Sequence, residues 1–172
     1  MKSIETERLL QLMDELYYRP LANVVHFTDS DTLLCKRLAH YCRDKEYSYQ
    51  VNTPDRTFFE ETQKTLQEIP EAKCFHMPLQ RPKFRIAGKE YEYFILTLPL
   101  AEEIRLTFLK KAHEIIRSHG KIVIFLPKGD RALKDAWIAD LETTLFVATS
   151  ILDDLFDTYD VILSTKMHGW GD

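Results

Sequence analysis

Two short apolar runs separated by an amphipathic segment form the clearest pattern in the chain. The first run covers residues 93–99, is rich in β-forming side chains and ends at a proline. Residues 102–117 follow with apolar side chains at three- and four-residue steps, as in a helix of about four turns. Ser118-His119-Gly120 predicts a turn before the second apolar run, residues 121–127. Both runs are apolar at consecutive positions, which is typical of parallel strands buried on both faces. The pattern predicts a strand–helix–strand unit at the centre of an α/β sheet.

The first half of the chain alternates short apolar runs with segments of helical periodicity. Ser30 or Asp31 is a suitable N-cap for the helix that follows the first run, because its oxygen accepts from free amides of the first turn. Pro54 fits the first turn of the next helix. This alternation predicts β-α-β-α-β, the first half of a doubly wound sheet, preceded by an N-terminal helix. The predicted helices are 3–18, 32–44 and 53–68, and the predicted strands are 23–27, 47–52 and 72–77.

The second half continues this pattern and ends in a different way. Apolar and charged residues alternate around Gly88 over residues 83–92, which predicts a hairpin leading into the strand at 93. Residues 131–142 predict a helix, and residues 145–149 and 159–166 predict the last two strands. The connection between them, residues 151–158, is short, so these two strands are expected to be antiparallel.

Length and composition place the chain among ordinary globular proteins. Its 172 residues are 45% hydrophobic and 29% charged, which predicts one domain, residues 1–172. We expect an N-terminal helix in residues 1–20, an α/β core in 21–166 and a tail in 167–172. The net charge of −4 argues against a nucleic-acid partner. No apolar run approaches the roughly 20 residues of a membrane span, and the N-terminus lacks a signal-peptide pattern, so we expect a cytoplasmic protein without membrane contact.

Cysteine and histidine spacing does not indicate a metal site. Cys35 and Cys42 share a predicted helix but lie about 10 Å apart along its axis, which is too far for a disulfide. The chain has no C-x-x-C pair and its six histidines have no H-E-x-x-H spacing, so no metal is expected. His26 and His76 stand in or beside strand ends, where each is a hydrogen-bonded core residue or a general base.

The order of elements from residue 21 to 166 resembles the class I S-adenosylmethionine (SAM)-dependent methyltransferase family. The run Phe94-Ile95-Leu96-Thr97-Leu98-Pro99 is similar to the family's fourth strand with its proline motif. The helix, glycine and strand of residues 109–124 resemble the elements that follow it, and residues 145–166 resemble the family's final strand pair. The resemblance implies a three-layer Rossmann-like fold, with a mostly parallel sheet, an antiparallel last strand and an extra N-terminal helix.

The resemblance also indicates where SAM would bind, although each position departs from the family pattern. Family members hold SAM with a glycine-rich loop after the first strand, where this chain has Phe27-Thr28-Asp29-Ser30-Asp31-Thr32. No glycine precedes Gly88, which argues against a phosphate-cradling loop. Asp29 and Asp31 suit a ligand cation such as a sulfonium, or else they belong to an exposed capping turn. By resemblance, the other predicted contacts are Asn52 to the ribose, Met77 near the adenine, and Thr97 where amine methyltransferases often carry Asn or Asp.

Three functional hypotheses remain from the sequence. The first is a methyltransferase-like enzyme diverged in its cofactor loop, in which Thr28, Asp29, Asp31, Asn52, Met77 and Thr97 bind SAM and the protein positions a nucleophile for in-line attack. The second is a non-catalytic scaffold or protein-interaction module on the same fold, and the third is a binder of a different small molecule. An open pocket lined by these six residues favours the first hypothesis, and a crevice filled by side chains favours the second. Catalytic residues are not identifiable.

Two surface features predict contacts with other chains. Trp170 stands between two glycines in the tail, where it anchors a partner, folds over the sheet edge or frays. The N-terminal helix either covers the sheet or contacts a partner subunit. Tyr17, Tyr18, Tyr47 and Tyr49 suggest an adhesive surface, and we expect a homodimer.

Overall fold

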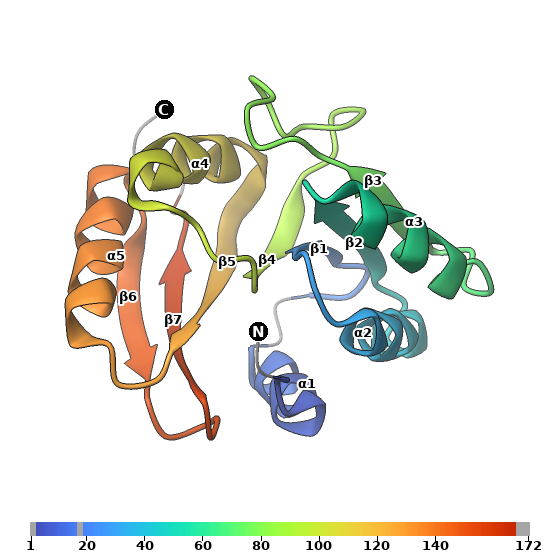
Figure 1. Ribbon diagram of the computed structural model, residues 1–172, viewed down its shortest axis with the longest axis horizontal. Coiled ribbons are helices and arrows are strands. Elements are labelled where there is room, and N and C mark those ends of the chain that lie inside the picture. The colour runs from blue at the N-terminus through green and yellow to red at the C-terminus, as the bar shows by residue number, and fades with distance from the viewer. Residues whose placement is uncertain (1–2, 17–18, 168–172) are drawn as a thin grey trace.

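Within the residues that the structure describes, 3–16 and 19–167, a seven-stranded sheet forms the middle layer (Figure 1). In this computed structural model the strand order is β3-β2-β1-β4-β5-β7-β6. Strand β7 is antiparallel to β5 and β6, and the other neighbouring strands are parallel. The predicted antiparallel ending is therefore confirmed. The strands are β1 (Asn23–Phe27), β2 (Ser48–Thr53), β3 (Ala72–His76), β4 (Tyr91–Leu96), β5 (Ile116–Pro127), β6 (Val147–Leu152) and β7 (Tyr159–Thr165).

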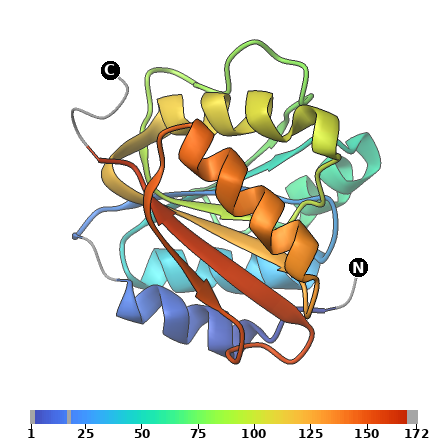
Figure 2. The same ribbon diagram turned by 90° about the vertical axis from the view of Figure 1, so that its left-hand side faces the viewer.

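Helices cover both faces of this sheet, as Figures 1 and 2 show from two directions. Helices α1, α2 and α3 contribute to the buried core on one face, and α4 and α5 contribute to the core on the other. Residues 77–90 link β3 to β4 without a helix and add Met77 and Phe84 to the second core. The three-layer α/β prediction is confirmed. The helices are α1 (Thr6–Glu15), α2 (Thr32–Asp44), α3 (Arg56–Thr65), α4 (Glu102–Ile115) and α5 (Arg131–Thr143).

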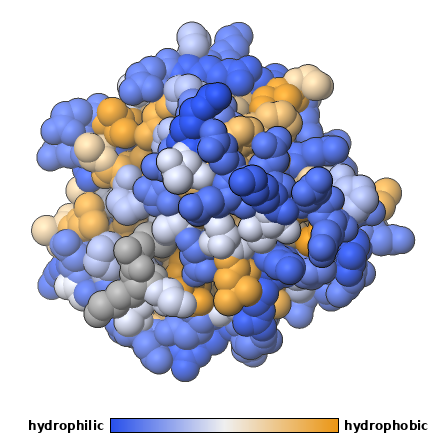
Figure 3. Space-filling model, turned by 45° about the vertical axis from the view of Figure 1, so that its right-hand side comes forward, coloured by the Kyte–Doolittle hydropathy of each residue, from blue (hydrophilic) through white to orange (hydrophobic). Residues whose placement is uncertain are grey.

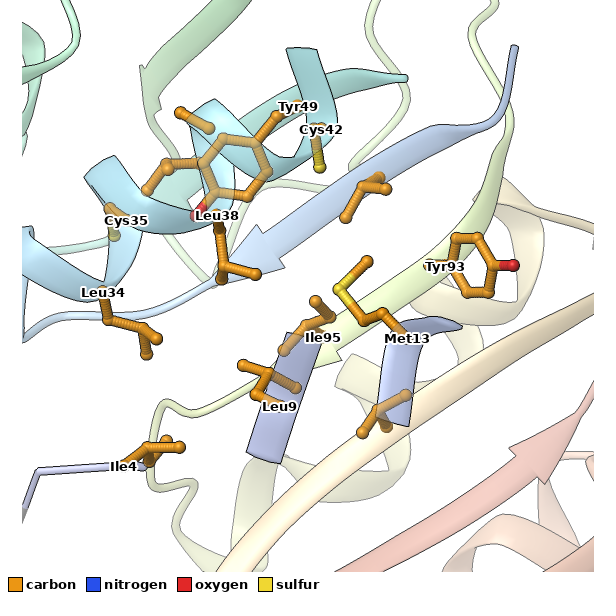
Figure 4. Packing of buried hydrophobic residues seen from close by; sticks show 14 of the residues in the cluster. Ile4, Leu9, Met13, Leu34, Cys35, Leu38, Cys42, Tyr49, Tyr93 and Ile95 are labelled. Carbon is orange, nitrogen blue, oxygen red and sulfur yellow. The ribbon is translucent and has the colours of Figure 1, made fainter. Parts of the chain in front are cut away.

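Helix α1 packs its apolar side on the sheet. Figure 4 shows Leu9 and Met13 of α1 pointing towards Ile95 of β4, with Leu34 and Leu38 of α2 beside them. Each of these side chains is at most 4% exposed. Burying one such side chain contributes about 1.5–3 kcal/mol. The sequence left two interpretations of this helix, a cover for the sheet or a contact with a partner subunit. Its apolar side covers the sheet.

The second core is built around aromatic rings. Phe27 of β1 stacks on Phe94 of β4 with ring centroids 5.0 Å apart. Phe108 of α4 meets Phe27 edge-on at 5.2 Å, and Phe84 lies 4.9 Å from Phe27. These contacts hold α4 and the segment after β3 against the same part of the sheet.

Aspartates begin three of the helices. In each case the carboxylate accepts a hydrogen bond from the backbone N–H three residues later, which satisfies an amide that the helix leaves free. The sequence offered Ser30 or Asp31 as the N-cap of α2, and the structure shows that it is Asp31. Helix α3 starts later than predicted, so Pro54 precedes its cap and does not lie in the first turn. The caps are Asp31, Asp55 and Asp130.

Two local predictions are wrong, and the boundary of a third element is shifted. Residues 83–92 do not form a hairpin, because Ala87 and Gly88 form an isolated turn with positive φ and β4 begins at Tyr91. Gly120 does not end an element, because β5 runs continuously from Ile116 to Pro127 with a register shift against β4. The connection predicted at 151–158 begins later, since β6 extends to Leu152.

The surface carries apolar side chains in small separate groups among polar ones on the face that Figure 3 presents. The most exposed of the large apolar side chains are Leu21 at 67% and Leu33 at 64%. In residues 3–16 and 19–167, no helix has both the length and the apolar character that crossing a bilayer requires. The adhesive surface predicted from four tyrosines is wrong for Tyr47 and Tyr49, because both are buried. Tyr17, Tyr18 and Trp170 lie outside the described residues.

Candidate functional site

The carboxyl ends of the parallel strands meet at one edge of the sheet, where open α/β sheets bind ligands. Phe27 at the end of β1 is level with Asn52 of β2 and with Leu96 of β4. Backbone bonds extend this alignment past the strands, since the Met77 N–H donates to the Thr53 carbonyl at 2.7 Å. The register therefore brings the six predicted cofactor residues to this edge, but it does not make all of them accessible.

The first-strand loop is bonded to itself. The Thr28 hydroxyl donates to the Ser30 carbonyl at 3.0 Å and faces the Ser30 N–H at 3.4 Å. Thr28 is fully buried. Asp31 has a φ of +70°, the left-handed region where glycine is usual, and its carboxylate caps α2. The Thr28 and Asp31 side chains thus bond backbone groups of the loop and of α2 that would otherwise be free to bond a ligand.

Asn52 faces the protein interior. Its Oδ1 accepts from the Gln50 side-chain amide at 2.8 Å, and the Gln50 Oε1 accepts from the Tyr91 hydroxyl at 2.7 Å. Both Gln50 and Asn52 are at most 2% exposed. The Asn52 Nδ2 has no hydrogen-bond partner within the described residues. A ribose at this position would have no open side chain to contact.

Thr97 belongs to a buried histidine network. The His26 Nε2 lies 2.8 Å from the Thr97 hydroxyl, and the His26 Nδ1 lies 2.8 Å from the Tyr49 hydroxyl. His26 is fully buried, and this burial lowers the pKa of its imidazole to about 3. With both ring nitrogens engaged, His26 is the hydrogen-bonded core histidine of the two sequence interpretations.

Thr97 also lines a small cavity on its other side. This cavity measures about 150 Å³ and is enclosed mostly by apolar side chains, among them Leu98, Leu133 and Trp137. Met77 is fully buried in the second core, and its sulfur lies 3.8 Å from the Arg81 guanidinium.

Of the six, Asp29 and Asp31 line a surface hollow. This hollow measures about 480 Å³ and is also lined by Asp55, the N-cap of α3, and by Glu61 of that helix. Partial burial raises the pKa of the Asp29 carboxyl, and the charge of Asp55 adds to that rise. The concentration of carboxylates suits a cation and repels an anion.

A separate groove opens on the α4 side of the same edge. This groove, here called the α4 groove, measures about 470 Å³ and lies between α4 and residues 76–80. Both elements lie on the upper side of the molecule in Figure 1. Its lining includes Pro54, His76, Leu79, Glu103, Ile104, Phe108 and Lys111.

His76 differs from His26 in its position. Its Nε2 lies 3.2 Å from the Pro54 carbonyl, and its ring is partly exposed at the α4 groove. His76 is thus a candidate contact residue of the α4 groove.

The sequence alone did not identify three other residues that line the groove, namely Pro54, Ile104 and Lys111. The available signal was Lys111, a lysine within the apolar stripe of α4 that Phe108, Ala112 and Ile115 define.

The residues predicted to hold SAM do not fit it as one site. Thr28, Asn52, Met77 and Thr97 are at most 2% exposed, and their polar atoms bond mainly to other protein groups. Asp29 and Asp31 open into a hollow whose lining includes none of these four, and none of the six lines the α4 groove. Within the described residues, the six predicted contacts are thus divided between buried positions and the hollow beside Asp29 and Asp31.

No metal centre or disulfide accompanies these sites in the described part of the chain. No group of three or more histidine, cysteine or acidic side chains there is placed to hold an ion. All three cysteines are free, and burial raises the pKa of the Cys35 and Cys74 thiols to about 12. These thiols are therefore protonated at neutral pH and behave as small apolar side chains.

Comparison with known proteins identifies the fold. A TehB-like SAM-dependent methyltransferase from Corynebacterium glutamicum aligns with 92% of this chain and 87% of its own, with a TM-score of 0.71 and 16% identity. For a SAM-dependent O-methyltransferase from Thermotoga maritima the coverages are 98% and 66%, the TM-score is 0.73 and the identity 10%. The SAM-dependent methyltransferase SibL matches over 95% of this chain and 55% of its own, with a TM-score of 0.70 and 16% identity.

No protein-family model matches the chain, and no curated protein matches it. The similarity to known proteins is therefore a similarity of fold, at low sequence identity. The chain has the class I methyltransferase-like fold, as the sequence resemblance predicts.

Proposed function

We propose that this methyltransferase-like protein binds a small molecule in the α4 groove and does not transfer a methyl group from SAM. The observation that carries the proposal is the contrast between two parts of one sheet edge. Four of the residues predicted to contact SAM are at most 2% exposed, whereas the α4 groove is open. A volume of about 470 Å³ lies within the range of small-molecule sites.

A second candidate is SAM-dependent methyl transfer, which two observations favour. The chain has the fold of SAM-dependent methyltransferases, with an antiparallel last strand. The hollow beside Asp29, Asp31 and Asp55 is acidic, and such a site suits the positive sulfonium of SAM. Under this candidate the enzyme mainly positions the methyl acceptor, and the buried residues must become accessible before the cofactor binds.

Calorimetric titration with SAM and S-adenosylhomocysteine separates these two functions. Our proposal predicts no binding heat at millimolar ligand. Micromolar binding that Asp29→Ala or Asn52→Ala abolishes would overturn it and establish the second candidate. Asp153→Ala removes an exposed carboxylate elsewhere and serves as the matched control. Micromolar binding that survives both site variants but is lost in Ile104→Glu would place SAM in the α4 groove and would also overturn the proposal.

Three sequence-based expectations continue as parts of the proposal. We infer a cytoplasmic location, a homodimer and a single domain over residues 1–172.

The apolar residues of α1 are used in the protein's own core, so this helix offers a partner only its polar side. Light scattering on wild type and Trp170→Ala tests the dimer: a monomeric mass for wild type rejects it, and a monomer only in the variant assigns the contact to the tail. A fluorescent fusion tests the location.

A further inference from the structure

Lys111 contributes a positively charged side chain to the lining of the α4 groove. The residue is 8% exposed and lines the groove. Its ammonium donates to the Leu79 carbonyl at 2.6 Å and to the Arg81 carbonyl at 3.0 Å, and lies 4.9 Å from the centre of the Phe84 ring. Among the described residues, Lys111 forms no ion pair. A nearly buried cation thus stands without a counter-ion.

This arrangement leaves both a charge and a donor to be satisfied. An ammonium has three N–H donors, and the two carbonyls use two of them. Burial disfavours the charged ammonium and so lowers the pKa of Lys111. Buried charges in proteins are normally paired. An anionic group that enters the groove would supply the missing charge and accept the third hydrogen bond.

The remaining lining restricts the ligand further. Pro54, Leu79, Ile104 and Phe108 give the groove apolar walls that suit an aliphatic or aromatic body. Glu103 also lines the groove and is exposed, so its negative charge disfavours a ligand with two negative charges. One lysine and one glutamate, about 12 Å apart along the axis of α4, suit a ligand with a single carboxylate better than a phosphate dianion.

We propose that the α4 groove binds an apolar or aromatic monocarboxylate, with its carboxylate paired to the Lys111 ammonium and its body between Ile104 and the residues after β3. This inference rests on the proposed function, because it names the ligand class of the same groove. It adds a charge requirement that the proposed function does not contain.

Paired probes test the charge requirement directly. Phenylacetate and indole-3-acetate are titrated into the full-length protein beside their uncharged amides, and binding is followed by amide chemical shifts in NMR. We expect the carboxylates to bind about tenfold more tightly than the amides, because a charge-assisted hydrogen bond is the stronger kind. Equal affinity of the two series would overturn the charge assignment, and no binding of any probe at millimolar concentration would overturn the inference as a whole.

Two variants on one helix locate the site. Ile104 and Leu106 are both on α4 and are 36% and 39% exposed, but only Ile104 lines the groove. Ile104→Glu should therefore lower carboxylate affinity at least about tenfold, while Leu106→Glu leaves it unchanged. An equal effect of both variants would contradict the placement.

Lys111 also has a structural role, which a further variant separates from binding. Lys111→Gln removes the charge and leaves one amide to bond the Leu79 and Arg81 carbonyls, so some loss of stability is expected in either case. The proposal requires in addition that the carboxylate and amide probes become equal in affinity. If the variant keeps the carboxylate preference, the cation lies elsewhere. These outcomes do not depend on the SAM titration, so failure of this inference and failure of the proposed function are distinguishable.

Discussion

His26 shows at the scale of one residue how the sheet edge has been closed. The imidazole connects β1 to β2 through Tyr49 and to the end of β4 through Thr97. A neutral histidine has one donor and one acceptor nitrogen, so these two hydroxyls satisfy it completely. Protonation would place an unpaired charge in the sheet, which is why burial lowers the pKa of His26 to about 3.

This network makes stability depend on pH. The folded-state pKa of about 3 lies below the ordinary value of 6.5, so between these values the unfolded chain binds more protons at this group. The contribution is fully present above pH 6.5 and is lost progressively as the pH falls towards 3. Between pH 7 and pH 5 we expect the free energy of unfolding to fall by about 2 kcal/mol because of this group.

Urea titrations of wild type and His26→Gln at these two pH values measure the effect. The glutamine keeps a donor and an acceptor but does not titrate, so the variant should lose less stability than wild type on acidification. A variant that is merely less stable at both values, with the same difference between them, would show that His26 does not carry the pH dependence.

At the scale of elements, Gly120 provides space that β5 needs against its own preceding residues and against β4. A Cβ at this position would lie 2.7 Å from the Arg117 carbonyl oxygen, 2.7 Å from the Ile116 Cγ2 and 3.1 Å from the Tyr91 carbonyl oxygen. The nearest of these are closer than real Cβ contacts, and two of the three atoms are backbone. The glycine is therefore required by lack of space in a strand and not by a turn.

Gly120→Ala should lower the free energy of unfolding by about 2–4 kcal/mol, because backbone must move or the register of β5 must change. Gly88→Ala is the comparison, since Gly88 has a φ of +72° but no atom within 4 Å of the added Cβ. It should cost only about 1 kcal/mol of left-handed strain. Chemical denaturation of both variants gives the ranking, and a smaller loss for Gly120→Ala than for Gly88→Ala would contradict this account.

The elements predicted correctly are those whose pattern lies within their own residues. Consecutive apolar residues in β4 and β5 indicate burial on both faces, and the short ending connection indicates the antiparallel β7. The hairpin prediction failed because Phe84 and Ile86 alternate with charged residues as in a strand, whereas Phe84 packs on Phe27 and Phe108. Partners distant in sequence decided that segment.

The same limit applies to the candidate site. Register places Asn52 and Thr97 at the sheet edge, and strand prediction suffices for that. Whether such a residue is open depends on Gln50, which bonds Asn52, and on His26, which bonds Thr97. Residue spacing does not encode these hydrogen bonds. The α4 groove depends on a contact between α4 and residues 76–80, elements separated by more than twenty residues, so no local pattern predicts it.

At the scale of the whole molecule, the two cores share the strands between them. Ile95 of β4 points into the core of α1 and α2, while its neighbours Phe94 and Leu96 point into the core of α4 and α5. Strand β1 divides in the same way, with Val24 on one side and Val25 on the other. The backbone hydrogen bonds of a strand support both cores at once, because its side chains alternate between them. The two cores should therefore unfold together.

Fluorescence of Trp137 tests this coupling in a Trp170→Phe background, because Trp137 is then the sole tryptophan and lies in the α4 and α5 core. Leu9→Ala, in the opposite core, should destabilise the protein by about 2–5 kcal/mol. Under two-state unfolding, the Trp137 transition should shift as far as the far-ultraviolet circular dichroism transition. Leu141→Ala, in the same core as Trp137, is the control that must shift both. A Trp137 midpoint that ignores Leu9→Ala would divide the chain into two units and reject the single domain predicted for residues 1–172.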